Sequence, residues 1–217
     1  MDETTPAMVT ILAEVRETPV AHARAYLVGA LRDGTFNRLH RTTRISQADE
    51  RWLRILQVLL QKLGKRGWIY REGSRGVWTI ETTWRPDGST ESWNETGQLA
   101  FARGYFDAEG GVPAQQSSRF YIQLVQKNHS DLDRLRTILE KAGIRCGRLH
   151  NPSPRVDPDY WRFYVLAASH QDFVRLVGSW HPRKRPLLLP KNLNSPGPAR
   201  GGRFHQFRPA SAAVQPT

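Results

Sequence analysis

The sequence predicts an α+β fold made of two repeats, each built as helix, two strands, helix, two strands. A stretch of small residues at one-turn spacing, closed by an acidic residue and a glycine, occurs twice, at 25–34 and 100–110. Each copy precedes short alternating segments and then an apolar stripe at helical spacing, at 52–63 and 132–139. The period is far too long for a solenoid, so two copies predict a pseudo-two-fold pair.

The elements of the first half follow from these patterns. We expect a lead-in helix at 8–19, the small-residue helix at 22–31, a strand pair over 35–47, a second helix at 49–63 and a hairpin over 68–82. Ser46 or Asp49 is expected to cap the second helix, and Gly64 to end it. The polar stretch 84–95, which contains Pro86 and Gly88, reads as a linker.

The second half repeats the order and adds a closing helix. We expect a helix that ends at Glu109, strands at 112–115 and 119–126, a helix at 130–142, strands at 144–149 and 161–167, and a helix at 171–180. The predicted domains are a lead-in at 1–21, a first repeat at 22–83, a linker at 84–95, a second repeat at 96–189 and a basic tail rich in Pro and Gly at 190–217. Each repeat is expected to form a four-stranded antiparallel sheet, with the small-residue helices packed together at the axis.

Composition restricts the partners. The 217 residues carry a formal net charge of +12, which is typical of chains that bind nucleic acid or an anionic membrane surface. No apolar run is long enough to span a bilayer and no signal peptide is visible, so we expect no membrane partner and a cytoplasmic, nucleoid-associated or organellar location. The single cysteine and the spacing of the seven histidines argue against disulfides and zinc.

The acids that end the two helices carry the chemistry. Glu109 lies at the C-terminus of a helix, where the macrodipole disfavours a carboxylate by about 0.3–1 kcal/mol. If the small faces formed by Ala100 and Gly104, and by Ala25 and Gly29, pack together, Asp33 and Glu109 lie side by side. A divalent cation such as Mg²⁺ would relieve their repulsion, polarise a phosphodiester and supply a bound water as nucleophile.

Residues 102–110 also resemble the second signature of the LAGLIDADG homing endonucleases. Glu109 falls on the metal-binding acid of that signature and Asp107 on its first acid. The first copy, 26–36, lacks one residue between Gly29 and the acid, and Arg32 replaces the first acid. We align Asp33 with Glu109 across this gap.

An ungapped alignment would instead place Gly34 at the acid position and leave the first half without a metal ligand. The resemblance covers roughly 22–188.

This resemblance implies a monomeric, two-repeat, site-specific double-stranded DNA endonuclease with sheets that form a DNA-binding saddle. It implies a long asymmetric target and Mg²⁺ as cofactor, with Mn²⁺ as an alternative and Ca²⁺ as a non-catalytic substitute. The implied catalytic residues are the metal ligands Asp33 and Glu109, with Gln47, Gln126 and Lys184. Arg183 or Arg185 is an alternative to Lys184, because basic residues that bind phosphate give the same pattern.

The strands are expected to read the major groove, where Arg and Gln discriminate bases. Alternation places His40, Thr42 and Arg44 on one face in the first half, and Arg119, Tyr121 and Gln123 on one face in the second. The further candidates are Arg71, Arg75, Gln115, Gln116, Arg148 and His150.

Two other functions compete. Arg32 and the missing residue before Asp33 favour a catalytically impaired nucleic-acid-binding protein, either an RNA maturase or a DNA-binding regulator. A basic structural protein would instead bind DNA without sequence preference and lose its affinity at modest salt.

Overall fold

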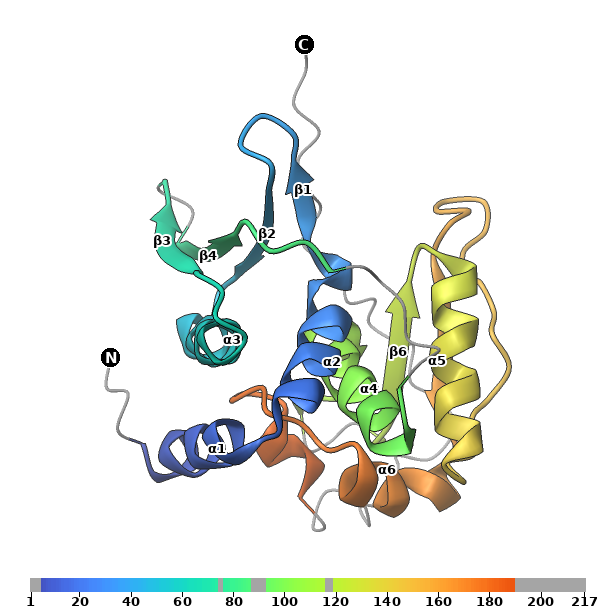
Figure 1. Cartoon of the computed structure of the whole chain (residues 1–217). Coiled ribbons are helices and arrows are strands. Elements are labelled where there is room, and N and C mark those ends of the chain that lie inside the picture. Colours follow the sequence, from blue (N-terminus) through green and yellow to red (C-terminus); the bar gives the residue numbers. More distant parts are fainter. Residues whose placement is uncertain (1–4, 74–75, 87–92, 116–118, 190–217) are drawn as a thin grey trace.

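The computed structural model of the chain describes residues 5–73, 76–86, 93–115 and 119–189, apart from the side chain of Asp33. The first half contains α1 (Pro6–Glu17), α2 (Val20–Ala30), the 3₁₀ turn η1 (Leu31–Asp33), β1 (Thr35–Asn37), β2 (Thr42–Gln47), α3 (Glu50–Lys62), β3 (Trp68–Glu72) and β4 (Val77–Thr82). Figure 1 shows α2 at the centre of the molecule, beside α4, with the first-half sheet above α3.

The second half contains α4 (Glu95–Glu109), β5 (Gly110–Gly111), β6 (Ile122–Gln126), α5 (His129–Lys141), β7 (Trp161–Val165), η2 (Ala167–Ser169), α6 (His170–Leu176) and η3 (Arg185–Leu188). The fold is therefore α+β, and within the described residues both sheets are antiparallel. No described helix is long and apolar enough to cross a bilayer.

Helices α2 and α4 pack against each other through glycines. A Cβ added at Gly29 would lie well inside 3.0 Å of the Phe101 carbonyl oxygen, and one at Gly104 would lie as close to that of Tyr26. The two contacts are reciprocal, because each glycine meets the carbonyl three residues before the other. This confirms the small-residue contact predicted for the two helices and makes Gly29 the equivalent of Gly104.

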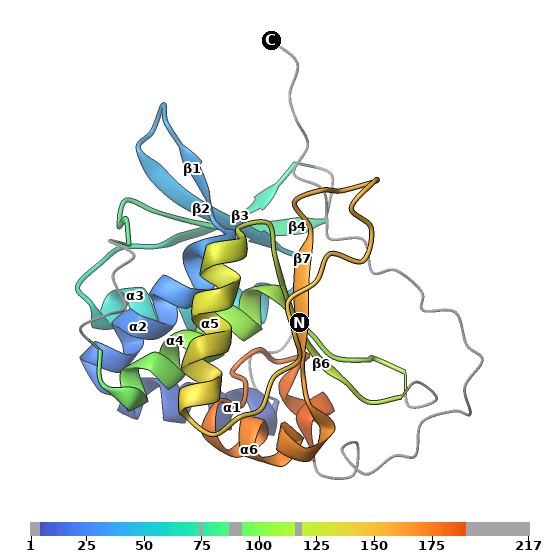
Figure 2. The same cartoon turned by 90° about the vertical axis from the view of Figure 1, so that its right-hand side faces the viewer.

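The two sheets each have one covered face. In the first half the strand order is β1-β2-β4-β3, and Ile45 pairs with Ile80 on the face that packs against α3. In the second half the order is β5-β6-β7, and Leu124 pairs with Phe163 on the buried face. Figure 2 shows the two sheets meeting at an angle beyond the ends of the central helices. We call the opposite, uncovered faces the outer faces.

The second-half sheet differs from its prediction. Residues 112–115 form no strand, and of the described residues 110–115 only Gly110 and Gly111 pair with β6. Pro113 has no N–H to give to a ladder, which is consistent with the strand ending before it.

Residues 144–149 also form no regular strand. Cys146 forms an isolated bridge to Val165, and His150 forms one to Arg162. Between these bridges the chain advances four residues in the 144–150 segment but three in β7. This one-residue bulge breaks the edge of the sheet, and the described second-half sheet has three strands rather than the expected four.

The closing helix is also shorter than predicted. α6 ends at Leu176 rather than continuing to Trp180. Gly178 adopts a left-handed φ of +59°, which ends the helix and redirects the chain. The segment that follows, residues 177–185, runs against both halves and is called the strap below.

The strap ties the first half to the second. Arg185 forms two hydrogen bonds to the Glu14 carboxylate, at 2.8 and 2.6 Å, and Arg183 Nε lies 3.2 Å from Asp49 Oδ2. His181 is buried and stacks on Trp52, with ring centroids 5.4 Å apart. Because α1 and α3 both contact it, the strap fixes the first half relative to α4.

Candidate active site and nucleic-acid interface

The central helices run in the same direction and end together. Near their N-termini, His22 Nε2 lies 3.0 Å from Thr96 Oγ1, and their middles meet at Gly29 and Gly104. At the other end η1 contacts α4. Glu109, the last residue of α4, is half-buried there. Asp33 ends η1, and its side chain lies outside the described part of the structure.

The 3₁₀ turn compensates for the residue missing from the first copy. A 3₁₀ helix rises about 2.0 Å per residue and an α-helix about 1.5 Å. The four steps from Gly29 to Asp33 therefore advance about 7.5 Å along the axis, as do the five from Gly104 to Glu109. With these ideal rises, the backbones of the two acids lie at about the same height along the helix axes.

The glycines after the two acids support the same alignment. Gly34 donates its N–H to the Leu31 carbonyl at 2.9 Å, and Gly110 donates its N–H to that of Phe106. A Cβ at either position would lie under 3.0 Å from that same carbonyl oxygen. The bond of Gly34 reaches three residues back and that of Gly110 four, but both glycines then leave the helix in a similar extended conformation, directly after Asp33 and Glu109.

Glu109 lies between the protein interior and the outer face of the second sheet. Burial raises the pKa of Tyr105, and the charge of Glu109 raises it further. Burial also raises the pKa of Tyr160, and Glu109 again contributes. Tyr105 is fully buried, and its hydroxyl makes no hydrogen bond of good geometry within the described residues, although Gln126 is near enough to lower its pKa. An unsatisfied polar atom and a carboxylate at a helix C-terminus are features that a bound cation and its waters would satisfy.

The first-acid positions of the two copies have different surroundings. Asp107 is 1% exposed and accepts hydrogen bonds from the hydroxyls of Tyr26 and Ser179 and from the Trp180 N–H. Burial raises the pKa of Asp107, and the hydrogen bonds partly offset this. Asp107 is therefore an internal junction between α2, α4 and the strap.

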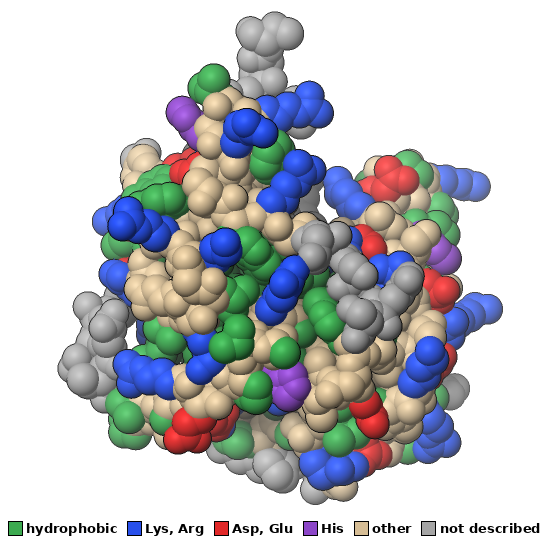
Figure 3. Space-filling model, in the orientation of Figure 1, with side chains coloured by type: hydrophobic (Ala, Val, Ile, Leu, Met, Phe, Trp, Pro, Cys, Tyr) green, Lys and Arg blue, Asp and Glu red, His purple; other side chains and the backbone are tan. Residues whose placement is uncertain are grey.

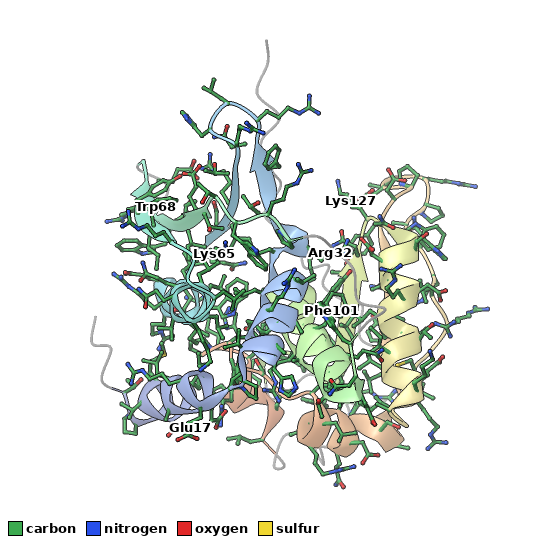
Figure 4. The ribbon with its side chains drawn as sticks, in the orientation of Figure 1. Glu17, Arg32, Lys65, Trp68, Phe101 and Lys127 are labelled. Atoms are coloured by element: carbon green, nitrogen blue, oxygen red, sulfur yellow. The ribbon has the colours of Figure 1, made fainter. Side chains whose placement is uncertain are left out.

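Arg32 in the first copy is partly exposed and faces the second half. Its Nη1 lies 3.0 Å from Asp131 Oδ2, in the first turn of α5. Figure 4 labels Arg32 at the end of α2 and Phe101 on α4. The replacement of an acid by Arg32 thus adds a contact between halves.

The other proposed catalytic residues are distributed as follows. Gln47 ends β2 and Gln126 ends β6, each just before the second helix of its half. Gln126 Oε1 accepts a hydrogen bond from the Lys127 N–H at 2.7 Å. Lys184 Nζ donates to the carbonyls of Phe106 and Asp107, at 2.8 and 2.7 Å, and so lies within the last turn of α4.

On the first-half sheet, Thr42 and Arg44 share the outer face. Thr42 donates a hydrogen bond to Glu81, and Arg44 forms an ion pair with Glu72. His40 is exposed in the turn before β2, and Arg71 is exposed on β3. Arg75 lies outside the described residues.

On the second-half sheet, Tyr121 and Gln123 lie toward the outer face. Tyr121 contacts Tyr164 edge to face, with centroids 6.0 Å apart, and Gln123 pairs with Tyr164 across the strands. His150 stacks on the same ring, with centroids 6.1 Å apart. Arg119, Gln115 and Arg148 are exposed outside the regular strands, and Gln116 lies outside the described residues.

Sequence reasoning missed several residues of this face. Arg162 Nε donates to His150 Nε2 at 3.2 Å, and its guanidinium lies 5.4 Å from the centre of the Tyr164 ring. The alternation of Arg162 and Tyr164 with buried Phe163 and Val165 is visible in the sequence and would have identified them.

In the first-half sheet, sequence reasoning also missed Glu72 and Glu81, which alternate with Arg71 and Ile80.

Basic side chains are not confined to the sheets. On the face shown in Figure 3, Lys and Arg side chains are spread over several elements, with Asp and Glu among them. Within the described residues, no three His, Cys, Asp or Glu side chains form a metal-binding group. Any metal at the helix ends would therefore depend on the acids of the two helices together with water or phosphate oxygens.

Comparisons with known proteins agree with this architecture. The family model for a LAGLIDADG-like domain matches residues 96–178. The homing endonuclease I-ApeI of Aeropyrum pernix is 27% identical over 227 aligned positions, which cover 88% of this chain and 99% of that protein.

Solved structures share the fold. I-DmoI in complex with DNA and Mn superposes with a TM-score of 0.56 at 17% identity, over 74% of this chain and 98% of that one. The N-terminal LAGLIDADG domain of DUF199/WhiA gives a TM-score of 0.61 at 17% identity, over 81% of this chain and 93% of that one. Other I-DmoI structures contain DNA and Ca, or target DNA in the presence of Mg.

The signature at 102–110, the glycine-paired central helices and these matches agree with one another. Residues 96–178 match a LAGLIDADG-like domain, and the chain as a whole is similar to the homing endonuclease I-ApeI over most of its length.

Proposed function

We propose that this protein is a metal-dependent, site-specific endonuclease that cuts both strands of a long, asymmetric DNA duplex. The observation that supports the proposal is that η1 and α4 contact each other and each end in an acid followed by a glycine, Asp33 before Gly34 and Glu109 before Gly110. I-ApeI is a homing endonuclease, and I-DmoI structures contain DNA together with divalent ions, which supports the same activity here.

The residues present fit a divalent cation, with Mg²⁺ the first candidate and Mn²⁺ an alternative. When bound, such an ion supplies positive charge that polarises a phosphodiester and activates water. Glu109 and Asp33 would hold it, and Gln47 and Gln126 would orient water from the adjacent strand ends. Lys184 counters the negative end of the α4 dipole and would stabilise charge that develops on the phosphate.

The outer faces would bind the duplex from the two sides of these acids. The many Lys and Arg side chains behind the net charge of +12 would contact phosphates. The side chains that would face the bases are His40, Thr42 and Arg44 in the first half, and Tyr121, Gln123 and His150 in the second. Because the two faces carry different residues, the two halves of the target would differ. One chain already supplies both halves, so the active form would be a monomer.

Glu109→Gln tests the proposal. The variant keeps the shape of the side chain and removes its charge, so we expect cleavage of target duplex to fall by about three orders of magnitude. Binding of the same duplex in Ca²⁺ should change less than threefold, on the order of what surface substitutions cause. Glu95→Gln, at the other end of α4, is the matched control and should cleave normally. Unchanged cutting by Glu109→Gln would refute the assignment.

A binding protein without cleavage is the second candidate. The observation in its favour is Arg32, which replaces an acid and pairs with Asp131, and the DUF199/WhiA domain shares the fold. The assay is incubation of the wild-type chain with its selected duplex in Mg²⁺ and in Mn²⁺. Tight, sequence-selective binding with no cut strand in either metal would favour this candidate over the nuclease.

A further inference from the structure

The outer face of the first-half sheet carries more negative than positive charge. Its strand residues are the alternate positions of β1 to β4: Thr35, Asn37, Thr42, Arg44, Ser46, Trp68, Tyr70, Glu72, Val77, Thr79 and Glu81. Among these, Arg44 is the one cation, whereas Glu72 and Glu81 are both carboxylates. This is unexpected for a surface that would meet a polyanion in a chain of net charge +12.

The carboxylates are part of an ordered network. Arg44 on β2 reaches across β4 to pair with Glu72 on β3, where the Thr79 hydroxyl lies 3.4 Å from the same carboxylate. Glu81 accepts hydrogen bonds from the hydroxyls of Thr42 and, at 3.0 Å, Tyr70. These contacts hold the side chains in defined positions before any ligand arrives.

Glu81 stays charged at neutral pH, and the network remains accessible. The hydrogen bond from Thr42 lowers the pKa of Glu81, with further lowering by Tyr70 and Arg44. The side chain of Glu72 is 40% exposed and that of Arg44 is 26% exposed. A phosphate brought against this surface would meet two carboxylates and a single guanidinium, which is a net repulsion.

The outer face of the second-half sheet shows what is distinctive about the first. Its regular-strand side chains are Gln123, Val125, Arg162 and Tyr164, with no carboxylate among them. His150 and Tyr160 extend the face with a ring nitrogen and a hydroxyl. One described face therefore suits a polyanion directly, while the other opposes it.

Base edges provide partners that phosphates do not. In the major groove, a carboxylate accepts from the N4 amino group of cytosine, and an arginine donates to O6 and N7 of guanine. The Arg44–Glu72 pair presents both groups side by side, as a G·C pair requires. A sequence without a matching amino group leaves a carboxylate desolvated and unpaired, which penalises binding.

Building on the proposed function, we propose that Glu72 and Glu81 are specificity-determining residues that select cytosine amino groups in one half of the target. The two carboxylates lower the affinity of this half for duplexes that lack these amino groups. The second-half face then supplies affinity and the first-half face supplies discrimination.

Binding selection from a pool of 40-bp duplexes with a randomised centre tests this proposal, in Ca²⁺ so that cleavage does not contribute. The chains compared are wild type, Glu72→Gln, Glu81→Gln and the control Glu50→Gln. Glu50 pairs with Arg54 on α3, so its variant makes the same charge change away from the outer face. A circular dichroism melt of each variant checks that the sheet is intact.

We expect cytosine preferences in one half-site of the wild-type selection. Each of Glu72→Gln and Glu81→Gln should lose about tenfold in discrimination at one position, with a shift toward adenine, the base that Gln pairs with. Both should bind an arbitrary 40-bp duplex several-fold more tightly than wild type at 150 mM salt, a gain that Glu50→Gln should not share.

Two results would overturn the inference: unchanged base preferences in both variants, or a gain in affinity no larger than that of Glu50→Gln. These leave the nuclease proposal standing, because Glu109→Gln tests it separately. Failure of the wild-type chain to bind any duplex would instead overturn both.

Discussion

Helices α2 and α4 are alike where they touch and different where they end. Where the helices cross, Gly29 meets the carbonyl of Phe101 on α4, and Gly104 meets the corresponding carbonyl of Tyr26 on α2. Beyond the crossing, α2 tightens into a 3₁₀ turn with Arg32 facing α5, whereas α4 stays α-helical to Glu109 and buries Asp107.

This difference shows which constraints the two halves share. A backbone contact with no room for a Cβ permits one residue type, so the two copies agree there. The ends face different neighbours, α5 for one and the strap for the other, and their side chains differ accordingly. Symmetry is therefore retained in the backbone that places the acids and relaxed in the side chains around them.

Substitutions where α2 and α4 cross should have the largest effect on unfolding free energy. Gly29→Ala and Gly104→Ala each drive a methyl group into a rigid backbone carbonyl, so each should cost about 3 kcal/mol or more in unfolding free energy. Urea unfolding checks this. Because the contacts are reciprocal, the two losses should agree within about 1 kcal/mol; a tolerated alanine at only one site would break the symmetry.

Substitutions at the two first-acid positions, Asp107 and Arg32, should instead cause very different losses of unfolding free energy. Asp107→Leu leaves the donors of Tyr26, Ser179 and Trp180 without an acceptor in a buried site and should cost about 3 kcal/mol. Arg32→Met breaks a partly exposed ion pair and should cost less than about 1 kcal/mol. Equal losses in thermal or urea unfolding would show that the two positions are equivalent after all.

The strap that joins the halves should make stability depend on pH. Burial lowers the pKa of His181 to about 3, and the nearby cations Lys184 and Arg183 contribute, whereas Asp49 acts in the opposite direction. The pKa of a histidine in the unfolded chain is about 6.5, so protonation at lower pH favours the unfolded state. The stability that comes from a neutral His181 is therefore fully present above about pH 6.5 and is lost as the pH falls toward 3. At pH 5 the loss should be about 2 kcal/mol.

Urea unfolding at pH 7.5 and pH 5 measures this loss. His181→Asn keeps an acceptor for the Arg183 N–H but does not titrate, so it should lose less stability between the two pH values. A wild-type pH dependence that matches the variant would exclude His181 as its source.

The two buried tyrosines provide the smallest test. Tyr26 on α2 bonds to Asp107 at 2.6 Å and accepts from Trp52 Nε1 at 3.0 Å, so Tyr26→Phe should cost about 1–2 kcal/mol. Tyr105 on α4 has an unsatisfied hydroxyl within the described residues, so Tyr105→Phe should stabilise the free protein by about 1 kcal/mol. Differential scanning calorimetry should therefore show shifts of opposite sign; a destabilised Tyr105→Phe would mean its hydroxyl is satisfied.

Local patterns predicted the elements whose own residues determine them. The spacing of Ala100, Gly104 and Ala108 predicted the helix contact, because a bare face permits little else. The Asp49 cap of α3 was also predictable, since its side chain accepts from the N–H of Arg51, only two residues away.

Features set by distant partners were not predictable. Residues 144–149 have strand-like composition, but the bulge opposite β7 depends on a register that alternation does not encode. The course of the chain after α6 depends on the bond from the Trp180 N–H to Asp107, 73 positions away, although the end of the helix itself follows from Gly178 nearby. The roles of Glu72 and Glu81 likewise required the pairing of β3 and β4 with β2.

The 3₁₀ turn at Leu31–Asp33 has a consequence for reading divergent copies of a motif. A deletion within a helix ordinarily shortens it and rotates everything downstream, yet here the larger rise per residue of the 3₁₀ turn offsets the missing residue. Matching residues by number would discard Asp33, whereas matching them by height along the axis retains it. When one member of a duplicated pair lacks a position, the pitch of its last turn is the first property to measure.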